Sequence, residues 1–427
     1  MGVSEAAELI VVNCGQLITL AGSDRPRVGP ELRELAIELN AALAVGAGRV
    51  MGTGSWEEIK HFAGPNSQFV DAAGQVVMPG FIDAHTHFVF AGSRAEEFER
   101  RALGETYQSI AAGGGGIRST VRMTRAASEG ELFASAKRRS AWLIRTGTTT
   151  AEAKSGYGLS LESELKILKV IRRLHQVGPL RLIPTFLGAH EYPDEFRDKK
   201  ASYVQLLINE MLPAVARERL AEFADIFCEP HVFENTTARL IMTAAKSHGL
   251  RLRLHVDQLS NSGGAELAAS LGAVTADHLE QTGASGIAAL RSANVQPVLL
   301  PGSVYALGSR KYPDARQMID AGLALVLATD LNPGSSPTPS IPMIISLAVT
   351  QMKLSVSEAI TATTINAAHS LGIGQESGSL QVDKRADFVI HECSDYRDLG
   401  YIFGVETADQ VFVGGSRVYT RARIDQY

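Results

Sequence analysis

Residues 77–87 of this 427-residue chain read VMPGFIDAHTH, an apolar run of the kind that forms a buried strand, followed by two histidines. Seven more apolar runs follow it, and each leads through a polar segment into a pattern typical of a helix. The eight runs are VMPGFID (77–83), TTTAEAK (148–154), RLIPTFLG (181–188), ADIFCE (224–229), RLRLHV (251–256), AVTAD (273–277), VQPVLL (295–300) and ALVLATD (324–330). Eight β/α repeats over about 300 residues predict a (β/α)8 TIM-like barrel. A doubly wound sheet is the alternative, and the number eight favours closure.

The two ends of the chain have a different pattern. Residues 1–77 contain short runs such as ELIVVN and QFVDAAGQVV, rich in β-branched residues and broken by Gly, Asn and Asp. Residues 377–427 return to this pattern in ADFVIHE and DQVFVGGSRVYT. We therefore expect both termini to build one small β domain beside a barrel of residues 78–376.

Composition narrows the class of protein. Hydrophobic residues make up 45% of the chain, charged residues 20%, and the formal net charge is −5 with no basic block. This argues against a nucleic-acid or anionic-membrane partner. The three cysteines, Cys14, Cys228 and Cys393, are too scattered for a disulfide framework or a cysteine zinc site. Without a signal peptide or a run of about 18 apolar residues, a cytoplasmic location is predicted.

Ligand-type residues stand at the ends of the predicted strands. In an extended strand residues two apart point to the same side, so His85 and His87 present two imidazoles to one point. The fifth, sixth and eighth runs end in or beside His255, His278 and Asp330. Barrels of this kind place their chemistry at these carboxyl ends. We expect a metal site there, held by His85, His87, His255 and Asp330.

The expected ligands also limit the metal and its chemistry. Three imidazoles and one carboxylate suit Zn²⁺ or iron and do not suit Mg²⁺ or Ca²⁺. Such an ion lowers the pKa of water and polarises a carbonyl. Asp330 is placed to accept the proton of that water, and His278 to hold the water or to stabilise the developing oxyanion.

With these residues the chain resembles the amidohydrolase superfamily, on PGFIDAHTH (79–87), His255, His278 and Asp330. The resemblance implies that the strand-rich termini form a composite β-sandwich. Many members bind two metals bridged by a carboxylated lysine on the fourth strand. Here the fourth run ends in Cys228-Glu229, which favours one metal, although some relatives use a glutamate there.

Longer motifs are similar to those of the imidazolonepropionase family. They are HTHFVFAGSR (85–94), EAKSGYGL (152–159), TFLGAHE (185–191), HVDQ (255–258), ADHLE (276–280) and TDLNPGS (329–335). The resemblance spans the whole barrel. It implies a homodimeric cyclic amidohydrolase that converts 4-imidazolone-5-propanoate to N-formimino-L-glutamate, the third step of histidine degradation.

Four residues of these motifs are weighed against that substrate. Arg94 can clamp the propionate carboxylate with two parallel hydrogen bonds, or form a surface salt bridge in the charged segment 94–101. Tyr157 offers a hydroxyl from a Gly-Tyr-Gly loop, or packs over the barrel. His190 can donate to the ring oxygen or the carboxylate, or serve only structure. Gln258 can pair with the ring amide; because glutamine is no base, proton acceptance falls to Asp330 or His278.

The resemblance also implies that Asn332, Gly334 and Ser335 form a loop whose N–H groups and hydroxyl donate to substrate. The second-strand residue Lys154 is expected near substrate or behind the metal ligands. The four glycines 113–116 are expected to form a flexible loop facing the substrate, or a plain connector.

Two other functions stay open at this point. A purine or pyrimidine deaminase uses the same metal ligands but needs no carboxylate clamp, so Arg94 and residues 329–335 argue against it. A non-enzymatic scaffold keeps such a fold without its ligands, whereas all four ligand positions are filled here.

Overall fold

The computed structural model describes residues 6–105, 109–110 and 113–422. Its larger motif is a sheet of eight strands whose spatial order follows the chain from β6 to β13. These strands are β6 (Phe81–Asp83), β7 (Thr148–Lys154), β8 (Arg181–Ala189), β9 (Phe223–Cys228), β10 (Arg251–Val256), β11 (Thr275–His278), β12 (Gln296–Leu299) and β13 (Val326–Leu327). Each predicted apolar run overlaps one of them, and neighbours from β8 to β13 pair in parallel. The predicted βα fold is confirmed.

The sheet closes on itself just beyond β6 and β13. Thr86 and Leu331 form a parallel bridge, the N–H of His87 donates to the carbonyl of Leu331 at 2.8 Å, and the N–H of Asp330 donates to that of His85 at 3.0 Å. The backbone that closes the barrel therefore carries three of the predicted metal ligands.

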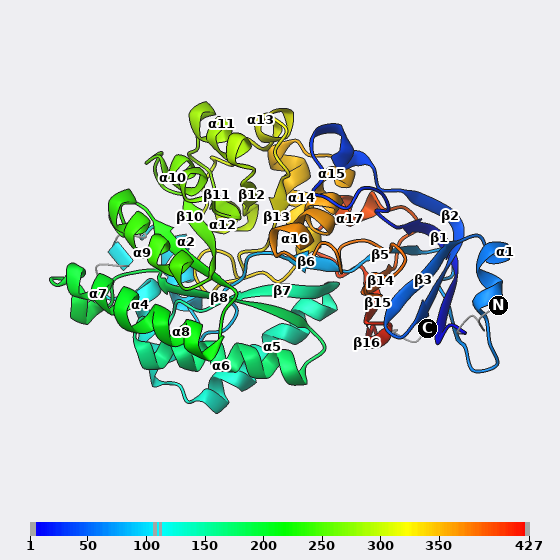
Figure 1. The fold of residues 1–427 in the computed structure, drawn as a ribbon, viewed down its shortest axis with the longest axis horizontal. Coiled ribbons are helices and arrows are strands. Elements are labelled where there is room, and N and C mark those ends of the chain that lie inside the picture. The colour runs from blue at the N-terminus through cyan, green and yellow to red at the C-terminus, as the bar shows by residue number, and fades with distance from the viewer. Residues whose placement is uncertain (1–5, 106–108, 111–112, 423–427) are drawn as a thin grey trace. The chain divides into compact units, whose positions relative to one another are not determined.

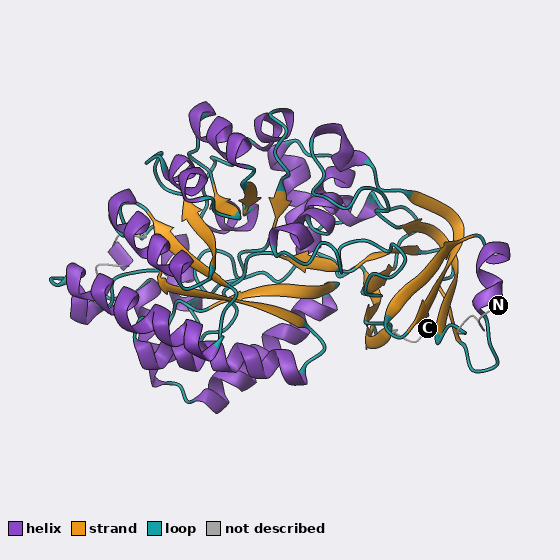
Figure 2. Ribbon diagram, in the orientation of Figure 1, coloured by secondary structure: helices purple, strands orange, loops and turns teal. Residues whose placement is uncertain are grey.

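Helices cover the outside of these strands, as Figures 1 and 2 show for α6, α9, α10 and α11. The helices are α1 (Trp56–Ile59), α2 (Ala95–Ala102), α4 (Ile117–Ala126), α5 (Glu129–Arg145), α6 (Leu161–Val177), α7 (Lys200–Leu206), α8 (Leu212–Glu218), α9 (Asn235–Ser247), α10 (Gly264–Leu271), α11 (Ala284–Ala293), α12 (Pro301–Ala306), α13 (Ala315–Asp320), α14 (Ile341–Met352), α15 (Val356–Ala362), α16 (Ile365–Ser370) and α17 (Asp398–Tyr401). None of the helices in the described part of the chain has the length and apolar character that crossing a bilayer requires.

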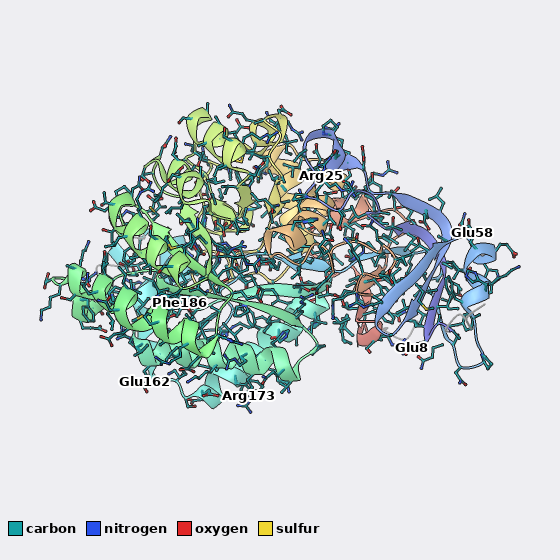
Figure 3. The ribbon with its side chains drawn as sticks, in the orientation of Figure 1. Glu8, Arg25, Glu58, Glu162, Arg173 and Phe186 are labelled. Atoms are coloured by element: carbon teal, nitrogen blue, oxygen red, sulfur yellow. The ribbon has the colours of Figure 1, made fainter. Side chains whose placement is uncertain are left out.

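Helix α6 shows how the sequence sets one of these elements. The hydroxyl of Ser160 caps its start by accepting from the N–H of Ser163, and acidic residues in its first turn suit the positive end of the helix dipole. Its apolar residues recur every three or four positions and are buried, whereas Glu162 and Arg173 lie exposed on its outer side (Figure 3). Phe186 on β8 is buried. This periodicity fixes which face of α6 packs on the barrel.

Both termini contribute to the second sheet, whose order is β16-β15-β14-β5-β1-β2-β3, with β4 also paired to β1. Its strands are β1 (Leu9–Ile18), β2 (Ile37–Gly46), β3 (Arg49–Gly54), β4 (Gln68–Asp71), β5 (Val76–Pro79), β14 (Phe388–His391), β15 (Ala408–Val413) and β16 (Ser416–Thr420). The antiparallel pair β5–β14 joins the N-terminal strands to the C-terminal ones. This confirms the predicted composite β domain.

Alternation along the strands gives this sheet two buried faces. Leu43 of β2 packs with Phe388 and Phe412, whose rings stack at 4.3 Å, while its neighbours Ala42 and Ala44 belong to a separate apolar cluster. Successive side chains of a strand point to opposite faces, so both faces of the sheet are apolar where they are covered.

The chain divides into two compact units. One comprises residues 1–84, 141–150 and 340–427, and the other residues 85–140 and 151–339. In this division α14, α15 and α16 belong to the first unit, and the candidate site described below lies within the second. The domain boundaries after residues 77 and 376 stay a prediction.

Candidate metal centre

Four buried side chains converge at the carboxyl ends of the barrel strands. The Nε2 atoms of His85 and His87 are 3.1 Å apart, and that of His255 is 3.3 Å from Nε2 of His87. Asp330 Oδ1 lies 3.6 Å from Nε2 of His85 and 3.4 Å from Nε2 of His87. Ligand atoms about 2.1 Å from a tetrahedral ion are about 3.4 Å from one another, so the separations among His85, His87 and Asp330 fit a zinc-like ion, and His255 forms a second possible group with His85 and His278. The structure thus brings together all four predicted ligands.

The three imidazoles are held in the neutral form that binds metals. Burial, aided by the positive charge of Lys154, holds the pKa of His85 well below its ordinary value. Burial also lowers the pKa of His87 strongly and that of His255 to about 4. A neutral imidazole keeps a lone pair on one nitrogen, as metal binding requires.

Two carboxylates behind the histidines orient these lone pairs. His85 Nδ1 donates to Asp277 Oδ2 at 2.7 Å. His255 Nδ1 lies 3.0 Å from Asp225 Oδ2, in a short but bent contact. A carboxylate on Nδ1 fixes the ring and directs the lone pair of Nε2 toward the ion. Sequence reasoning missed the role of Asp225; an aspartate inside an apolar strand was the available signal, because buried carboxylates need partners.

His278 and Asp330 sit on unusual backbone. Their φ angles are 82° and 54°, in the left-handed region that residues other than glycine rarely adopt. The Nδ1 of His278 is 3.3 Å from Glu280 Oε1, and although burial opposes it, this carboxylate raises the pKa of His278. Burial raises the pKa of Asp330 to about 7, and His278 and Asn332 offset part of the effect. The two predicted catalytic groups are thus His278, an imidazole whose pKa is raised, and Asp330, a carboxyl whose pKa is about 7.

Tyr157 and His190 lie beside the histidine cluster. The ring of His190 stacks on that of His87 at 5.2 Å, and Tyr157 is 5.4 Å from His190 and 6.1 Å from His87. Nδ1 of His190 donates to the carbonyl of Gly156 at 3.0 Å, and burial lowers the pKa of this histidine to about 4. A neutral ring that donates through Nδ1 offers Nε2 as an acceptor. The donor role predicted from the sequence therefore requires a protonated ring.

Arg94 is packed against the loop that follows Asp330. Its Nε donates to Glu97 Oε2 at 2.8 Å, and its side chain is only 9% exposed. A Cβ added to Gly334 would lie 2.2 Å from Nη1 of Arg94, so the guanidinium occupies the space that glycine leaves. Arg94 therefore forms an ion pair with Glu97, as one of the two alternatives predicted. This pair is nearly buried, whereas the alternative expected it at the surface.

Asn332 shapes that loop from within. Its Oδ1 accepts from the N–H groups of Gly334 and Ser335, both at 2.7 Å, and its Nδ2 donates to the carbonyl of Asp330. The N–H groups predicted to donate to substrate are thus engaged inside the loop. The hydroxyl of Ser335 lies 3.4 Å from Asp330 Oδ2.

The remaining predicted residues have varied surroundings. Gln258 is half-buried two residues beyond β10. Glu229 accepts from the N–H of Leu259 and the hydroxyl of Ser260, so it holds the loop after β10. Lys154 is fully buried and donates to two carboxylates.

The glycine run 113–116 is connected to Arg94 through Glu97. The N–H of Gly116 donates to Glu97 Oε1 at 3.0 Å, and the other oxygen of this carboxylate accepts from Arg94. The run begins directly after residues 111–112, which lie outside the described part of the chain.

Comparisons with known proteins show the family of the chain. Residues 76–418 match the model of the Amidohydrolase family. The chain is 58% identical to an imidazolonepropionase of Solibacter usitatus, over 96% of this chain and 99% of that protein. It is 44% identical to one of Symbiobacterium thermophilum, over 98% of both chains.

Solved structures share the fold at low identity. An adenosine deaminase from Xanthomonas campestris with bound zinc has a TM-score of 0.73 at 17% identity, with 100% of this chain and 96% of that chain covered. The E. coli guanine deaminase has a TM-score of 0.70, also at 17% identity, with 97% and 99% covered. At this identity these structures show the fold alone, whereas the sequence relatives show the family. The chain belongs to the amidohydrolase family and, within it, to the imidazolonepropionases.

Proposed function

We propose that this chain hydrolyses the ring amide C–N bond of 4-imidazolone-5-propanoate to N-formimino-L-glutamate. The imidazolonepropionase relatives, up to 58% identical over almost the whole chain, support the reaction. The observation that carries the substrate assignment is the packing of Arg94 against Gly334, four residues beyond Asp330. This packing supports a role for Arg94 in binding a carboxylate beside the loop that follows Asp330.

The ligand set supports one Zn²⁺ or iron ion held by His85, His87, His255 and Asp330. When bound, the ion lowers the pKa of a water molecule and polarises the ring carbonyl. Lys154 and Glu229 are engaged by other partners, which argues against a second ion. The metal ligands thus define the position at which water attacks.

The protein's own groups then move the proton. Asp330 accepts it from the attacking water and returns it to the ring nitrogen as the C–N bond breaks. His278, whose pKa Glu280 raises against the effect of burial, donates to the carbonyl oxygen as negative charge develops there. Water thus supplies the new carboxylate oxygen and the proton on the leaving nitrogen, and its second proton passes to solvent when the product acid ionises.

The substrate tail and ring are bound by residues that follow the barrel strands. Arg94 binds the propionate carboxylate, Tyr157 and Ser335 offer hydroxyls, and Gln258 and the acceptor nitrogen of His190 face the ring amide. The predicted homodimer, cytoplasmic location and absence of nucleic-acid partners complete the proposal.

Turnover of the imidazolone tests this function against the deaminase alternative. Purified protein saturated with zinc or iron should remove the imidazolone absorbance and release N-formimino-L-glutamate. Guanine, adenosine and cytosine serve as competing substrates. Turnover of one of these with no loss of imidazolone would refute the proposal. Less than half an equivalent of bound metal would instead favour the non-enzymatic scaffold.

A further inference from the structure

Five charged side chains form a layer inside the barrel strands, behind the candidate metal ligands. They are Glu152 and Lys154 of β7, Asp225 of β9, Arg253 of β10 and Asp277 of β11, and none is more than 2% exposed. Moving an ion out of water costs several kcal/mol even after relaxation, and only close partners offset this. Apolar residues would fill these strand positions more cheaply, so the layer needs an explanation beyond stability.

The layer is continuous from one imidazole to another. Lys154 Nζ donates to Asp225 Oδ2 at 2.7 Å and to Glu152 Oε1 at 2.9 Å. Arg253 continues the chain, with Nε 3.1 Å from Glu152 Oε1 and Nη2 3.6 Å from Asp277 Oδ2. The two outer carboxylates, Asp225 and Asp277, contact His255 and His85.

The carboxylates and the cations of this layer make different contacts. Asp225 and Asp277 each touch one imidazole, so the direction of Nε2 in His255 and His85 depends on where those carboxylate oxygens stand. Lys154 holds Asp225 at 2.7 Å and lies 3.9 Å from Asp277 Oδ2, and Arg253 holds Asp277. Glu152 touches both cations and ties the two halves together.

We propose that Lys154 and Arg253 are positioning residues for the metal ion, acting through Asp225 and Asp277 on the aim of His255 and His85. The inference rests on the metal site of the proposed function. It adds a role for the buried cations Lys154 and Arg253, which lie behind the carboxylates that orient the imidazoles. Changes to groups that orient metal-binding histidines typically cost 10–100-fold in metal affinity.

The test is the zinc affinity of the full-length variant Lys154→Met, measured by competition with a chromogenic chelator. Methionine has nearly the same length, lacks the charge and leaves the four ligands unchanged. We expect zinc to bind about 10–100-fold more weakly, and the rise in melting temperature on adding zinc to shrink accordingly.

Lys384→Met is the matched control. Lys384 is also a buried lysine, 5% exposed, but it lies in the other compact unit, where its Nζ donates to the carbonyl of Gly374. This variant should lower the melting temperature of the metal-free protein and leave zinc affinity unchanged. A purely structural role of Lys154 would give this same pattern.

Arg253→Lys keeps the buried charge but shortens the reach toward Asp277, so it serves if Lys154→Met does not fold. It should weaken zinc binding by about tenfold. Zinc affinity within twofold of the unaltered protein in a folded Lys154→Met or Arg253→Lys variant would overturn the inference. An unaltered protein that binds no stoichiometric zinc would instead refute the proposed function.

Discussion

At the scale of single residues, Arg94 is held in one orientation by two neighbours. Its Nε donates to Glu97, and its Nη1 end packs against Gly334. An added Cβ at Gly334 would lie 2.2 Å from one of these nitrogens and 3.3 Å from the other. A guanidinium fixed at one edge can offer the other edge to a carboxylate with little loss of freedom.

Replacement of Arg94 by alanine should raise KM for imidazolonepropionate by about 10–100-fold, the equivalent of losing a charged hydrogen-bonding pair of roughly 1.5–3 kcal/mol. Steady-state kinetics and metal analysis check this, and bound zinc should stay near one equivalent. Arg94→Lys should recover only a small part, since lysine cannot form two parallel bonds to a carboxylate.

The control for Arg94 is Arg100→Ala on helix α2, which begins directly after Arg94; Arg100 is half-buried and paired with Glu105. Its KM should equal that of the unaltered protein. An unchanged KM in Arg94→Ala would mean that the carboxylate is bound elsewhere.

At the scale of elements, helix α6 fixes the loop that carries Tyr157. Glu164 lies in its first turn and is buried, and its carboxylate accepts from the N–H groups of Gly156, Gly158 and Leu159 at 2.7–3.0 Å. A Cβ added to Gly158 would lie 2.6 Å from the backbone nitrogen of Glu164, so the loop fits closely on the helix start. Tyr157 stands in the middle of this anchored segment.

Glu164→Gln should loosen that loop, because an amide offers one acceptor oxygen where the carboxylate offers two. Leaving a buried N–H unsatisfied costs about 1–3 kcal/mol, so the melting temperature should fall by several degrees. As Glu164 acts through Tyr157, KM should rise several-fold while bound zinc stays unchanged.

Non-additivity separates positioning from general destabilisation of the loop. In a Tyr157→Phe background, Glu164→Gln should add little further change in KM. Glu162→Gln, an exposed change on the same helix, should alter neither KM nor melting temperature. Additive KM effects of Glu164→Gln and Tyr157→Phe would count against the positioning role.

The strands and the candidate ligands could be predicted from the sequence, whereas several contacts between side chains could not. Apolar runs located all eight barrel strands, since a buried strand must be apolar over its length, and strand-end positions gave the four ligands because parallel strands deliver their carboxyl ends to one side. The partners of Asp225 and Arg253 depend on the register between strands that are distant in sequence. Likewise, no pattern reveals that Asn332 engages the N–H groups of its own loop, because that depends on a side-chain rotamer.

At the scale of the whole molecule, the composite β domain depends on a pairing between chain ends. Strand β14 pairs with β5 through residues more than 300 positions away, and His391 ends that strand fully buried. Its ring lies 5.6 Å from that of Phe81, the first residue of β6, and its Nδ1 is 3.0 Å from Thr407 Oγ1. His391 is therefore a packing residue at the place where the N-terminal and C-terminal strands pair.

That burial makes stability depend on pH. Desolvation lowers the pKa of His391 to about 3, against an ordinary value near 6.5. Below pH 6.5 the unfolded chain binds a proton at this residue and the folded protein does not. Its contribution to stability is therefore fully present above about pH 6.5 and is lost progressively as the pH falls toward 3.

Between pH 7 and pH 5 His391 alone should account for about 2 kcal/mol of lost unfolding free energy. Urea denaturation at both pH values, with a chelator present so that metal release does not contribute, measures this loss. His391→Gln should have a pH-dependent loss smaller by about that amount, because glutamine does not titrate. His248→Gln, a change at an exposed histidine, should keep the full loss. Equal losses in His391→Gln and the unaltered protein would mean that the ring is hydrated or protonated in the folded state, and that the junction between β5 and β14 admits water.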